Sequence, residues 1–194
     1  PAQDRLLRAS QVRILSRALM VVSVFVGISL DGFLARPDGS FDFLPSDGGG
    51  ESGGFEQFIA GIDVLVMGRN TFDVVSGMSP WPYGKTPVVV LTHRPLDLSR
   101  APPGQVEGMA GEPADVVARL AARGLRNLYV DGGLLIQQFL RAGLVDRIIV
   151  TKVPVLIGQG IPLFGPLKKD VKLRHVSTRA FGPGFVQSEY AVLR

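Results

Sequence analysis

From Met20 onward, short runs of β-branched residues alternate with segments in which apolar side chains recur three and four positions apart. The runs are typical of buried strands, and the segments are typical of amphipathic helices. Strands that alternate with helices indicate an α/β fold with a mostly parallel central sheet. The pattern predicts strands over residues 21–29, 64–67, 87–92, 127–130 and 147–155, and helices over residues 55–61, 71–76, 113–123 and 134–142.

The C-terminal part of the chain changes to strand-like alternation. Residues 171–178 and 185–193 alternate apolar and polar positions, and Gly182, Pro183 and Gly184 lie between them. Glycine and proline favour turns, so the sequence predicts an antiparallel β-hairpin at the end of the sheet.

Residues 37–54 form a glycine-rich stretch with few apolar side chains, namely Phe41, Phe43 and Leu44. Glycine loses more backbone freedom on ordering than other residues do. The stretch is expected to be either a mobile lid or a disordered loop. As a lid, it would close over a site when both ligands of that site are bound.

Length and composition indicate one globular domain over residues 20–194. The chain has 194 residues, of which 46% are hydrophobic and 20% are charged, so it can bury a sizeable core. The richest apolar stretches, residues 21–30 and 147–158, are interrupted by Gly, Ser, Lys or Pro. They fall short of the roughly 20 residues that span a bilayer, so no membrane association is expected.

Cysteine is absent, which excludes disulfides, thiolate metal sites and cysteine nucleophiles. The two histidines, His93 and His175, are far apart in the sequence, so no metal site is expected. A chain without cysteine also suits a cytoplasmic enzyme, and the cytoplasm is the location that we expect.

Residues 1–19 are interpreted as a separate N-terminal extension, because Met20 opens the first strand pattern. The extension is rich in arginine and shows some helical periodicity. It is either a segment that packs loosely or docks on a neighbour, or an amphipathic or targeting helix. No apolar region precedes a small-residue cleavage site, which favours the first interpretation.

The charge balance, +4 with a pI of about 9.8, is compatible with nucleic acid as a partner. The basic residues are scattered, however, and aromatic residues do not alternate with them, so no nucleic-acid partner is expected. A pocket for an anionic cofactor explains the same balance.

Gly68 and Arg69 stand between a predicted strand and a helix whose first turn holds Thr71. Backbone N–H groups at a helix start can bind phosphate. Gly68 permits close approach, Arg69 supplies a charged donor, and Thr71 can cap the helix. An ordinary strand-to-helix turn with a surface arginine is the alternative.

Thr92, His93 and Arg94 end the next strand, where a nucleotide-binding sheet meets the adenosine ribose. An acidic residue at this position would bind the free ribose hydroxyls of NAD, whereas Thr92 and Arg94 suit a 2′-phosphate. We therefore expect NADPH rather than NADH. His93 is expected to be a partly exposed loop residue without a catalytic role.

Gly132 and Gly133 follow a predicted strand and precede a helix. Paired glycines allow a pyrophosphate to lie on the helix N-terminus, although a tight turn alone also needs glycine. The sequence around them lacks G-x-G-x-x-G, which counts against a standard Rossmann dehydrogenase.

Asp31 and Gly32 end the first strand, so a carboxylate stands at the strand's carboxyl end. Ligands of open α/β sheets bind at such ends. The alternative is an Asp-Gly turn that is capped by its own side chain.

Four motifs occur in one order: SLDGFLA (29–35), MGRNTF (67–72), VDGG (130–133) and PVLIGQGIPLF (154–164). With these motifs, residues 20–194 resemble the dihydrofolate reductase superfamily, and most of all the reductase domain of the bacterial bifunctional riboflavin deaminase-reductase. The resemblance implies a three-layer fold, hydride transfer from NADPH, and a small-molecule substrate that is pterin-like or a ribosylaminopyrimidine.

The resemblance also implies a role for each matching residue. Gly27 and Ile28 would lie beside the nicotinamide, and Asp31 would face the substrate. The phosphates and adenosine of NADPH would be held by Gly68, Arg69, Thr71, Thr92, Arg94, Gly132, Gly133 and Leu134.

Two features depart from the resembling proteins. True dihydrofolate reductases present a helix acid to the pteridine, but in the matching stretch neither Glu51 nor Glu56 is in register, which speaks against folate. The deaminase domain with its His and Cys zinc ligands is also missing, which is compatible with a stand-alone reductase. The alternatives are a catalytically silent or nucleic-acid-binding dimeric domain of the same fold.

A homodimer is expected as well. The strand-rich region over residues 147–193 carries more apolar surface than one sheet face can readily hide. Riboflavin-type reductase domains pair through this region, so the resemblance points the same way.

Overall fold

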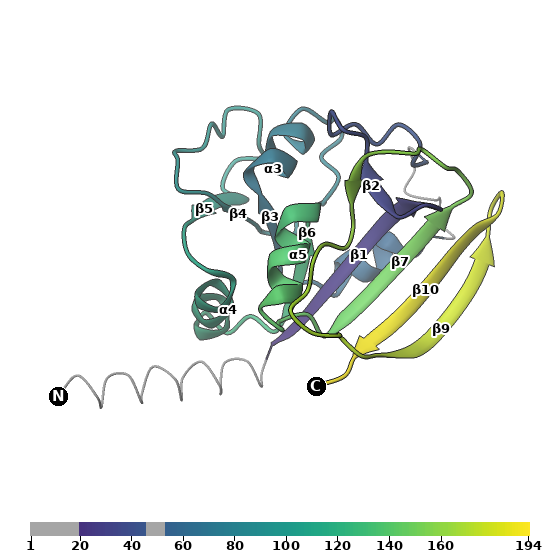
Figure 1. The fold of residues 1–194 in the computed structure, drawn as a ribbon. Helices are drawn as coiled ribbons and strands as arrows, with labels where there is room; N and C mark the ends of the chain where they lie inside the picture. The colour runs from purple at the N-terminus through teal and green to yellow at the C-terminus, as the bar shows by residue number, and fades with distance from the viewer. Residues whose placement is uncertain (1–19, 46–52) are drawn as a thin grey trace.

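The computed structural model describes residues 20–45 and 53–194, which form a mixed β-sheet flanked by helices (Figure 1). The strands of the main sheet are β1 (Val21–Ser29), β3 (Val64–Gly68), β4 (Val88–Leu91), β5 (Val106–Met109), β6 (Asn127–Asp131), β7 (Arg147–Val153), β9 (Leu173–Phe181) and β10 (Phe185–Val192). A second, two-stranded sheet pairs β2 (Phe33–Ala35) with β8 (Ile161–Pro162). The helices are α2 (Phe55–Ala60), α3 (Arg69–Val75), α4 (Pro113–Ala122) and α5 (Gly133–Arg141).

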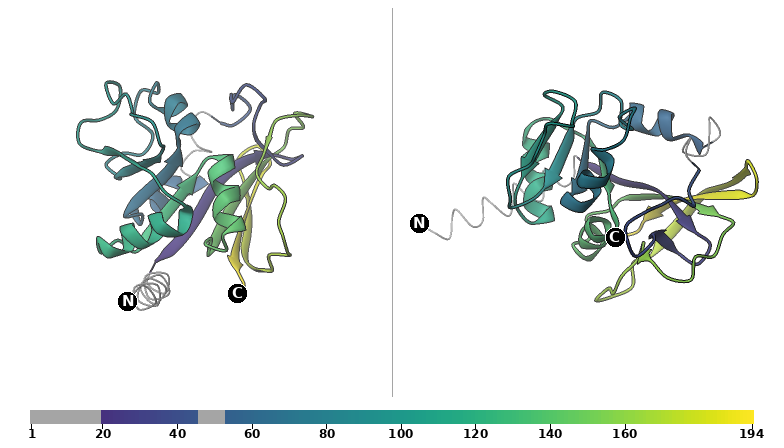
Figure 2. Two further views of the ribbon diagram at one scale, coloured as in Figure 1. Left: turned by 60° about the vertical axis from the view of Figure 1, so that its left-hand side comes forward. Right: turned by 90° about the horizontal axis from the view of Figure 1, so that it is seen from above.

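The main sheet has eight strands in the order β5-β4-β3-β6-β1-β7-β10-β9. Neighbouring strands are parallel from β5 to β7, whereas β10 runs antiparallel to both β7 and β9. The β9–β10 hairpin lies at the opposite end of the sheet from β5 (Figure 2). The predicted α/β fold, with a mostly parallel sheet and a C-terminal antiparallel hairpin, is confirmed.

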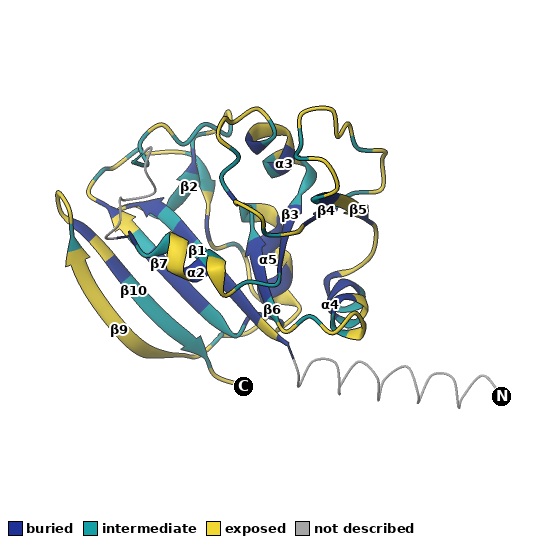
Figure 3. Ribbon diagram, turned by 180° about the vertical axis from the view of Figure 1, so that it is seen from behind, coloured by how far each residue is buried: buried dark blue, intermediate teal, exposed yellow. Residues whose placement is uncertain are grey.

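Two apolar clusters cover the two faces of the sheet and define three layers. Side chains of a strand alternate between faces, so Leu128 and Val130 of β6 pack with α4 and α5, whereas Tyr129 packs with α2 and α3. Figure 3 shows α2 over the face that is hidden in Figure 1, with the buried positions concentrated along the central strands. Burying one such apolar side chain stabilises the fold by about 1.5–3 kcal/mol.

The start of α3 corrects one prediction. The sequence places this helix at residues 71–76, but it begins at Arg69, and the residue at its N-cap is Gly68. Thr71 therefore lies inside the helix, and no side chain caps the helix start. The prediction that Thr71 caps the helix is therefore wrong, because the chain turns into the helix directly after β3.

Strands β2, β5 and β8 were not predicted. β5 reads VEGM and buries only its two ends, Val106 and Met109, so it lacks an apolar run. β2 and β8 have three and two residues, too few for a period to be recognised.

The apolar run of β7 was one reason to expect a dimer. Its central residues are buried on both faces within one chain, Ile148 and Val150 in the cluster with α4 and α5 and Ile149 in the other. The apolar run of β7 therefore needs no partner subunit. The edge strand β9, in contrast, is exposed over nearly its whole length.

None of the helices among residues 20–45 and 53–194 is long and apolar enough to cross a membrane. The same residues contain no group of His, Asp or Glu side chains that could hold a metal ion.

Candidate active site

The predicted phosphate-binding segments lie along one edge of the sheet. β1, β3, β4 and β6 are parallel, so their carboxyl ends face the same way (Figure 1). The register places Gly68 beside Leu91, and Met67 beside Asp131. The segments that begin at Arg69, Thr92 and Gly132 therefore come together although they are far apart in the sequence.

The starts of α3 and α5 touch at Thr71 and Gly132. A Cβ atom at Gly132 would collide with the Thr71 hydroxyl, and Gly132 has a φ of +94°, which favours glycine. No side chain caps the start of α5, so its first N–H groups are available to a ligand. The neighbouring Leu134 is 65% exposed. A Cβ at Gly68 would have nothing within 4 Å, so this turn also borders open space.

Arg69 connects this edge of the sheet to the segment after β4 through hydrogen bonds. Its Nε donates to the Asp73 carboxylate at 3.0 and 3.2 Å, and its Nη1 donates to the Pro95 carbonyl at 2.8 Å. The guanidinium is thus held across the gap between α3 and the loop that follows β4.

Thr92 and Arg94 form a local turn beside a hollow of about 540 Å³. The Thr92 hydroxyl accepts from the Arg94 N–H and donates to the Arg94 carbonyl, both at 3.1 Å. It therefore stabilises the turn that presents Arg94. The side chains of His93 and Arg94 are exposed, and the hollow is bordered on its other side by Gly108 and Met109.

Gly27 and Ile28 lie near the end of β1 and face opposite sides. Ile28 is buried in the core on the side of α4 and α5, so only its backbone can face a ligand. A Cβ at Gly27 would lie 2.9 Å from Cδ2 of Leu44. Leu44 of the glycine-rich stretch thus covers the position that we expected for the nicotinamide.

The glycine-rich stretch has local contacts before its undescribed residues, and after them the Gly53 carbonyl accepts from Gln187 Nε2 at 3.0 Å. Arg36 pairs with Asp42 at 2.6 Å, and the Leu44 N–H donates to the Phe41 carbonyl at 2.9 Å. Residues 46–52, which contain Glu51 and three glycines, lie outside the described residues.

Asp31 lies at the carboxyl end of β1, where its carboxylate accepts from two backbone N–H groups. The donors are Gly158 at 2.8 Å and Ile157 at 3.3 Å. Hydrogen bonding from the Ser29 side chain, and then from these backbone groups, lowers the pKa of Asp31. Asp31 thus fastens the loop after β7, and its role in catalysis stays a prediction.

A second carboxylate at this edge, Asp131, was quoted in the sequence motif but given no role. Its two oxygens accept from the Gly132 N–H at 2.8 Å and from the Tyr83 hydroxyl at 2.9 Å. Burial raises the pKa of Asp131, and it raises the pKa of the Tyr83 phenol well above its ordinary value. The signal that could have identified Asp131 is a charged residue directly before a glycine pair.

α2 carries no buried acid among its described residues. Its carboxylate, Glu56, is exposed, whereas Phe58 packs between Phe25 and Tyr129 with ring centres 4.8 and 5.1 Å away. Glu51, the other carboxylate considered from the sequence, lies outside the described residues, so the absence of an acid in register stays a prediction.

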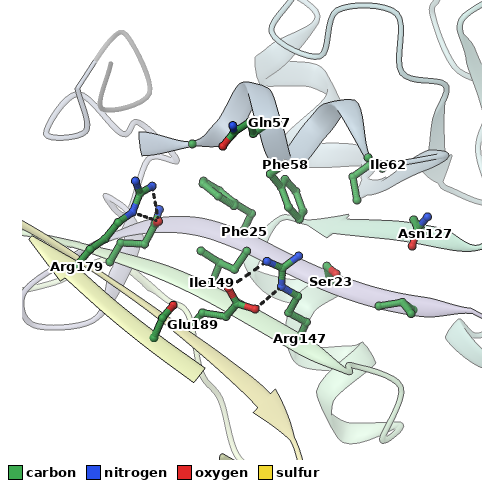
Figure 4. Close-up of a pocket in the computed structure, with 15 residues that line it drawn as sticks. Ser23, Phe25, Gln57, Phe58, Ile62, Asn127, Arg147, Ile149, Arg179 and Glu189 are labelled. Carbon is green, nitrogen blue, oxygen red and sulfur yellow. Dashed lines mark hydrogen bonds and ion pairs between the residues drawn. The ribbon is translucent and has the colours of Figure 1, made fainter. Parts of the chain in front are cut away.

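A second hollow, of about 400 Å³, lies between α2 and strands β7, β10 and β9 (Figure 4). Arg147 and Glu189 form a two-point ion pair in it at 2.7 and 3.1 Å, and Arg179 donates twice to Gln187. Ser23 and Arg147 place the hollow toward the amino ends of β1 and β7. It contains none of the residues that the sequence singled out.

Comparison with known proteins agrees with this arrangement. The family model described as RibD C-terminal domain matches residues 20–187. Uncharacterized protein YwjB of Bacillus subtilis (strain 168) is 32% identical over 169 residues, which cover 86% of this chain and 95% of that protein.

Two solved structures show the same fold. A protein of Shewanella sp. PV-4 assigned to riboflavin biosynthesis has a TM-score of 0.81 at 35% identity, over 90% of this chain and all of that chain. Dihydrofolate reductase of Enterococcus faecalis, complexed with NADP(H), has a TM-score of 0.64 at 17% identity, over 89% of this chain and 96% of that chain.

Proposed function

The chain belongs to the RibD C-terminal domain family, and from this premise we propose that it is an NADPH-dependent reductase of a small molecule, either pterin-like or a ribosylaminopyrimidine. Solved structures of similar fold include reductases, and the resembling dihydrofolate reductase is a complex with NADP(H).

The observation that carries the proposal is the meeting of α3 and α5 at Gly132. The uncapped start of α5 offers N–H groups and a positive dipole end beside Gly132, where Thr71 occupies the space that a Cβ would need. These features suit a pyrophosphate, so the residues present fit the cofactor. Gly132, Gly133 and Thr71 would hold the pyrophosphate, and the cofactor would supply a hydride.

Arg94 and Arg69 would bind the 2′-phosphate. Arg94 stands exposed at the rim of the hollow after β4, and Arg69 reaches the same segment through Pro95. No acidic residue stands at the end of β4, where NAD-binding proteins hold the ribose hydroxyls.

The nicotinamide would lie at the end of β1, against Gly27, where Leu44 now packs, and the substrate would lie beside it. Binding would thus require Leu44 to move, and Leu44 would afterwards exclude water from the reacting atoms. The protein supplies orientation and electrostatics, and the electron pair comes from the cofactor.

The test is a substrate screen that follows the absorbance of NADPH. The wild-type protein is incubated with NADPH and, in turn, with 7,8-dihydropterin, 7,8-dihydrofolate and 5-amino-6-(5-phosphoribosylamino)uracil. We expect oxidation of NADPH with the pyrimidine or the pterin. NADPH binding without any turnover would favour a catalytically silent domain, and polyanion binding without NADPH binding would favour a nucleic-acid-binding one.

A further inference from the structure

The hollow between α2 and strands β7, β10 and β9 lies apart from the proposed cofactor site (Figure 4). Its volume of about 400 Å³ is within the range of small-molecule sites. The hollow extends toward the amino ends of β1 and β7, whereas the proposed phosphate-binding segments lie at the carboxyl ends of the parallel strands. The proposed function gives it no role.

Ser23 contributes a buried hydroxyl that the fold does not use. Four polar residues are buried within the described part of the chain, and the side chains of Ser29, Gln137 and Gln187 form hydrogen bonds with the protein. Ser23, which is 4% exposed, forms no side-chain hydrogen bond with the described residues. It lines the hollow (Figure 4). A buried hydroxyl without a partner is unfavourable, so its presence indicates a ligand that pairs with it.

Arg147 places a charged donor beside this hydroxyl. The register of β1 and β7 pairs Ser23 with Arg147, and both residues line the hollow on the same face of the sheet. Glu189 accepts from Nε of Arg147 at 2.7 Å and from Nη2 at 3.1 Å. Nη1 has no hydrogen-bond partner among residues 20–45 and 53–194, so it can donate to a ligand.

A second guanidinium, that of Arg179, makes the lining positive. Its Nε and Nη2 donate to the Gln187 amide oxygen at 3.0 and 2.8 Å. No carboxylate among the described residues forms an ion pair with it. Gly54 leaves room for this side chain, because a Cβ there would lie 2.8 Å from Nη2 of Arg179. The lining thus combines two guanidiniums with the one carboxylate of Glu189, and one positive charge is unbalanced.

Apolar side chains form another wall of the hollow. Phe25 and Ile149 come from the sheet, and Phe58 and Ile62 come from α2 and the turn after it (Figure 4). The rings of Phe25 and Phe58 pack with their centres 4.8 Å apart. Such a wall offers contact area to a flat apolar body, for example an aromatic ring. An apolar wall with a few convergent polar groups is typical of a small-molecule site.

We propose that this hollow binds a small aromatic monocarboxylate. The carboxylate accepts from Nη1 of Arg147 and from the Ser23 hydroxyl, and the charge of Arg179 balances the lining. The ring lies against Phe25 and Phe58. The proposal goes beyond the proposed function and does not depend on it, because NADPH takes no part in this binding.

The first test uses benzoate as the probe and needs no cofactor. The ¹⁵N-labelled protein is titrated with sodium benzoate while the amide shifts are recorded by NMR. We expect saturable shifts over residues 21–25, 57–62, 147–149 and 187–189, with a dissociation constant of about 1 mM or lower. Benzamide lacks the charge and acetate lacks the ring, so each should bind at least about fivefold more weakly. No saturable binding, or shifts confined to other residues, overturns the inference.

Two substitutions at Ser23 separate binding from folding. Ser23→Ala removes the hydroxyl and should weaken benzoate binding about tenfold. Its melting temperature should stay the same or rise, because no hydrogen bond within the protein is lost. Ser23→Val also fills the space beside Arg147 and should abolish measurable binding, while valine remains suited to a strand. Ser188→Ala, on the opposite face of the sheet, is the matched control and should bind benzoate like the wild type.

Unchanged benzoate affinity in both Ser23 variants contradicts the proposed site. A marked loss of stability in Ser23→Ala contradicts it as well, because the hydroxyl would then have a partner within the fold. The double variant Arg147→Gln, Glu189→Gln removes the donor charge together with its ion-pair partner, so no carboxylate is left unpaired. It should lose most of the preference for benzoate over benzamide, and a retained preference would show that Arg147 does not bind the carboxylate.

The last test distinguishes this site from the cofactor site. Benzoate should bind with the same affinity in the presence of saturating NADPH, and Ser23→Val should bind NADPH like the wild type. Competition between benzoate and NADPH would place benzoate in the cofactor site and overturn the inference. Failure of the protein to bind NADPH would contradict the proposed function alone, because the benzoate titrations are carried out without it.

Discussion

At the scale of single residues, Gly132 shows how much of the site depends on a contact that the sequence does not reveal. The pair Gly132–Gly133 predicts a turn before a helix, but it does not predict that Thr71, from another helix, fills the space of the missing Cβ. Asp131 escaped notice for the same reason, because its partner Tyr83 lies 48 positions away. Residue types at strand ends could be predicted, whereas contacts between distant segments could not.

A substitution at Gly132 separates backbone strain from ligand binding. Gly132→Ala places a methyl group against Thr71 at a positive φ, so it should destabilise the protein and abolish measurable NADPH binding. Gly143→Ala, just beyond the other end of α5, also places a methyl group at a positive φ, here +64°, but with nothing within 4 Å of it. It should lose only about 1–2 kcal/mol of unfolding free energy, with normal NADPH affinity. Equal losses of affinity in the two variants would contradict the role given to Gly132.

At the scale of elements, regular strands and amphipathic helices followed from periodicity. β1 agrees with its predicted bounds, and β7 ends two residues early at Val153. The short strands β2, β5 and β8 could not be predicted from periodicity, because they are strands through pairing with their neighbours and not through a pattern of their own. The start of α3 could not be predicted either, because the chain turns into this helix directly after β3. The glycine-rich stretch could be recognised by composition, but the contact of Leu44 with Gly27 could not.

The glycine-rich stretch should respond to ligands. Over residues 37–45 the backbone hydrogen bonds are local, such as Arg36 to Ser40 and Gly39 to Arg36, so these residues should exchange amide protons rapidly. Binding of both NADPH and substrate should slow exchange over residues 37–45 as Leu44 closes over the ligands. Hydrogen exchange measured by mass spectrometry checks this. Full protection in the free protein, or the same exchange with and without ligands, would contradict the lid.

At the scale of the whole molecule, the three-layer arrangement followed from the alternation of strands and helices, but the expected homodimer now rests on different residues. The apolar residues of β7 are buried within one chain. On the β9–β10 hairpin, in contrast, Leu173, Val176 and Val186 are exposed by 40%, 45% and 38%. The edge of β9 is also unpaired in the sheet. An exposed edge with apolar side chains favours pairing with a second copy.

The dimer can be tested by sedimentation. A symmetric interface doubles the effect of one substitution, so Val186→Asp should convert a dimer into a folded monomer at micromolar concentration. Val74→Asp on α3, exposed by 45%, is the matched control and should leave the dimer intact. A monomeric wild-type protein would contradict the dimer and leave the cofactor proposal standing.

The central claim, that this chain uses NADPH, is tested most directly by titrating the protein with NADPH and NADH in parallel while the fluorescence of Trp81 is recorded. NADPH should bind at least about tenfold more tightly, because charge-assisted bonds from Arg94 and Arg69 to the 2′-phosphate contribute about 1.5–3 kcal/mol. Arg94→Ala should remove most of this preference, whereas Arg141→Ala, at the far end of α5, should keep it. Equal affinities for the two cofactors, or no binding of either, would contradict the account.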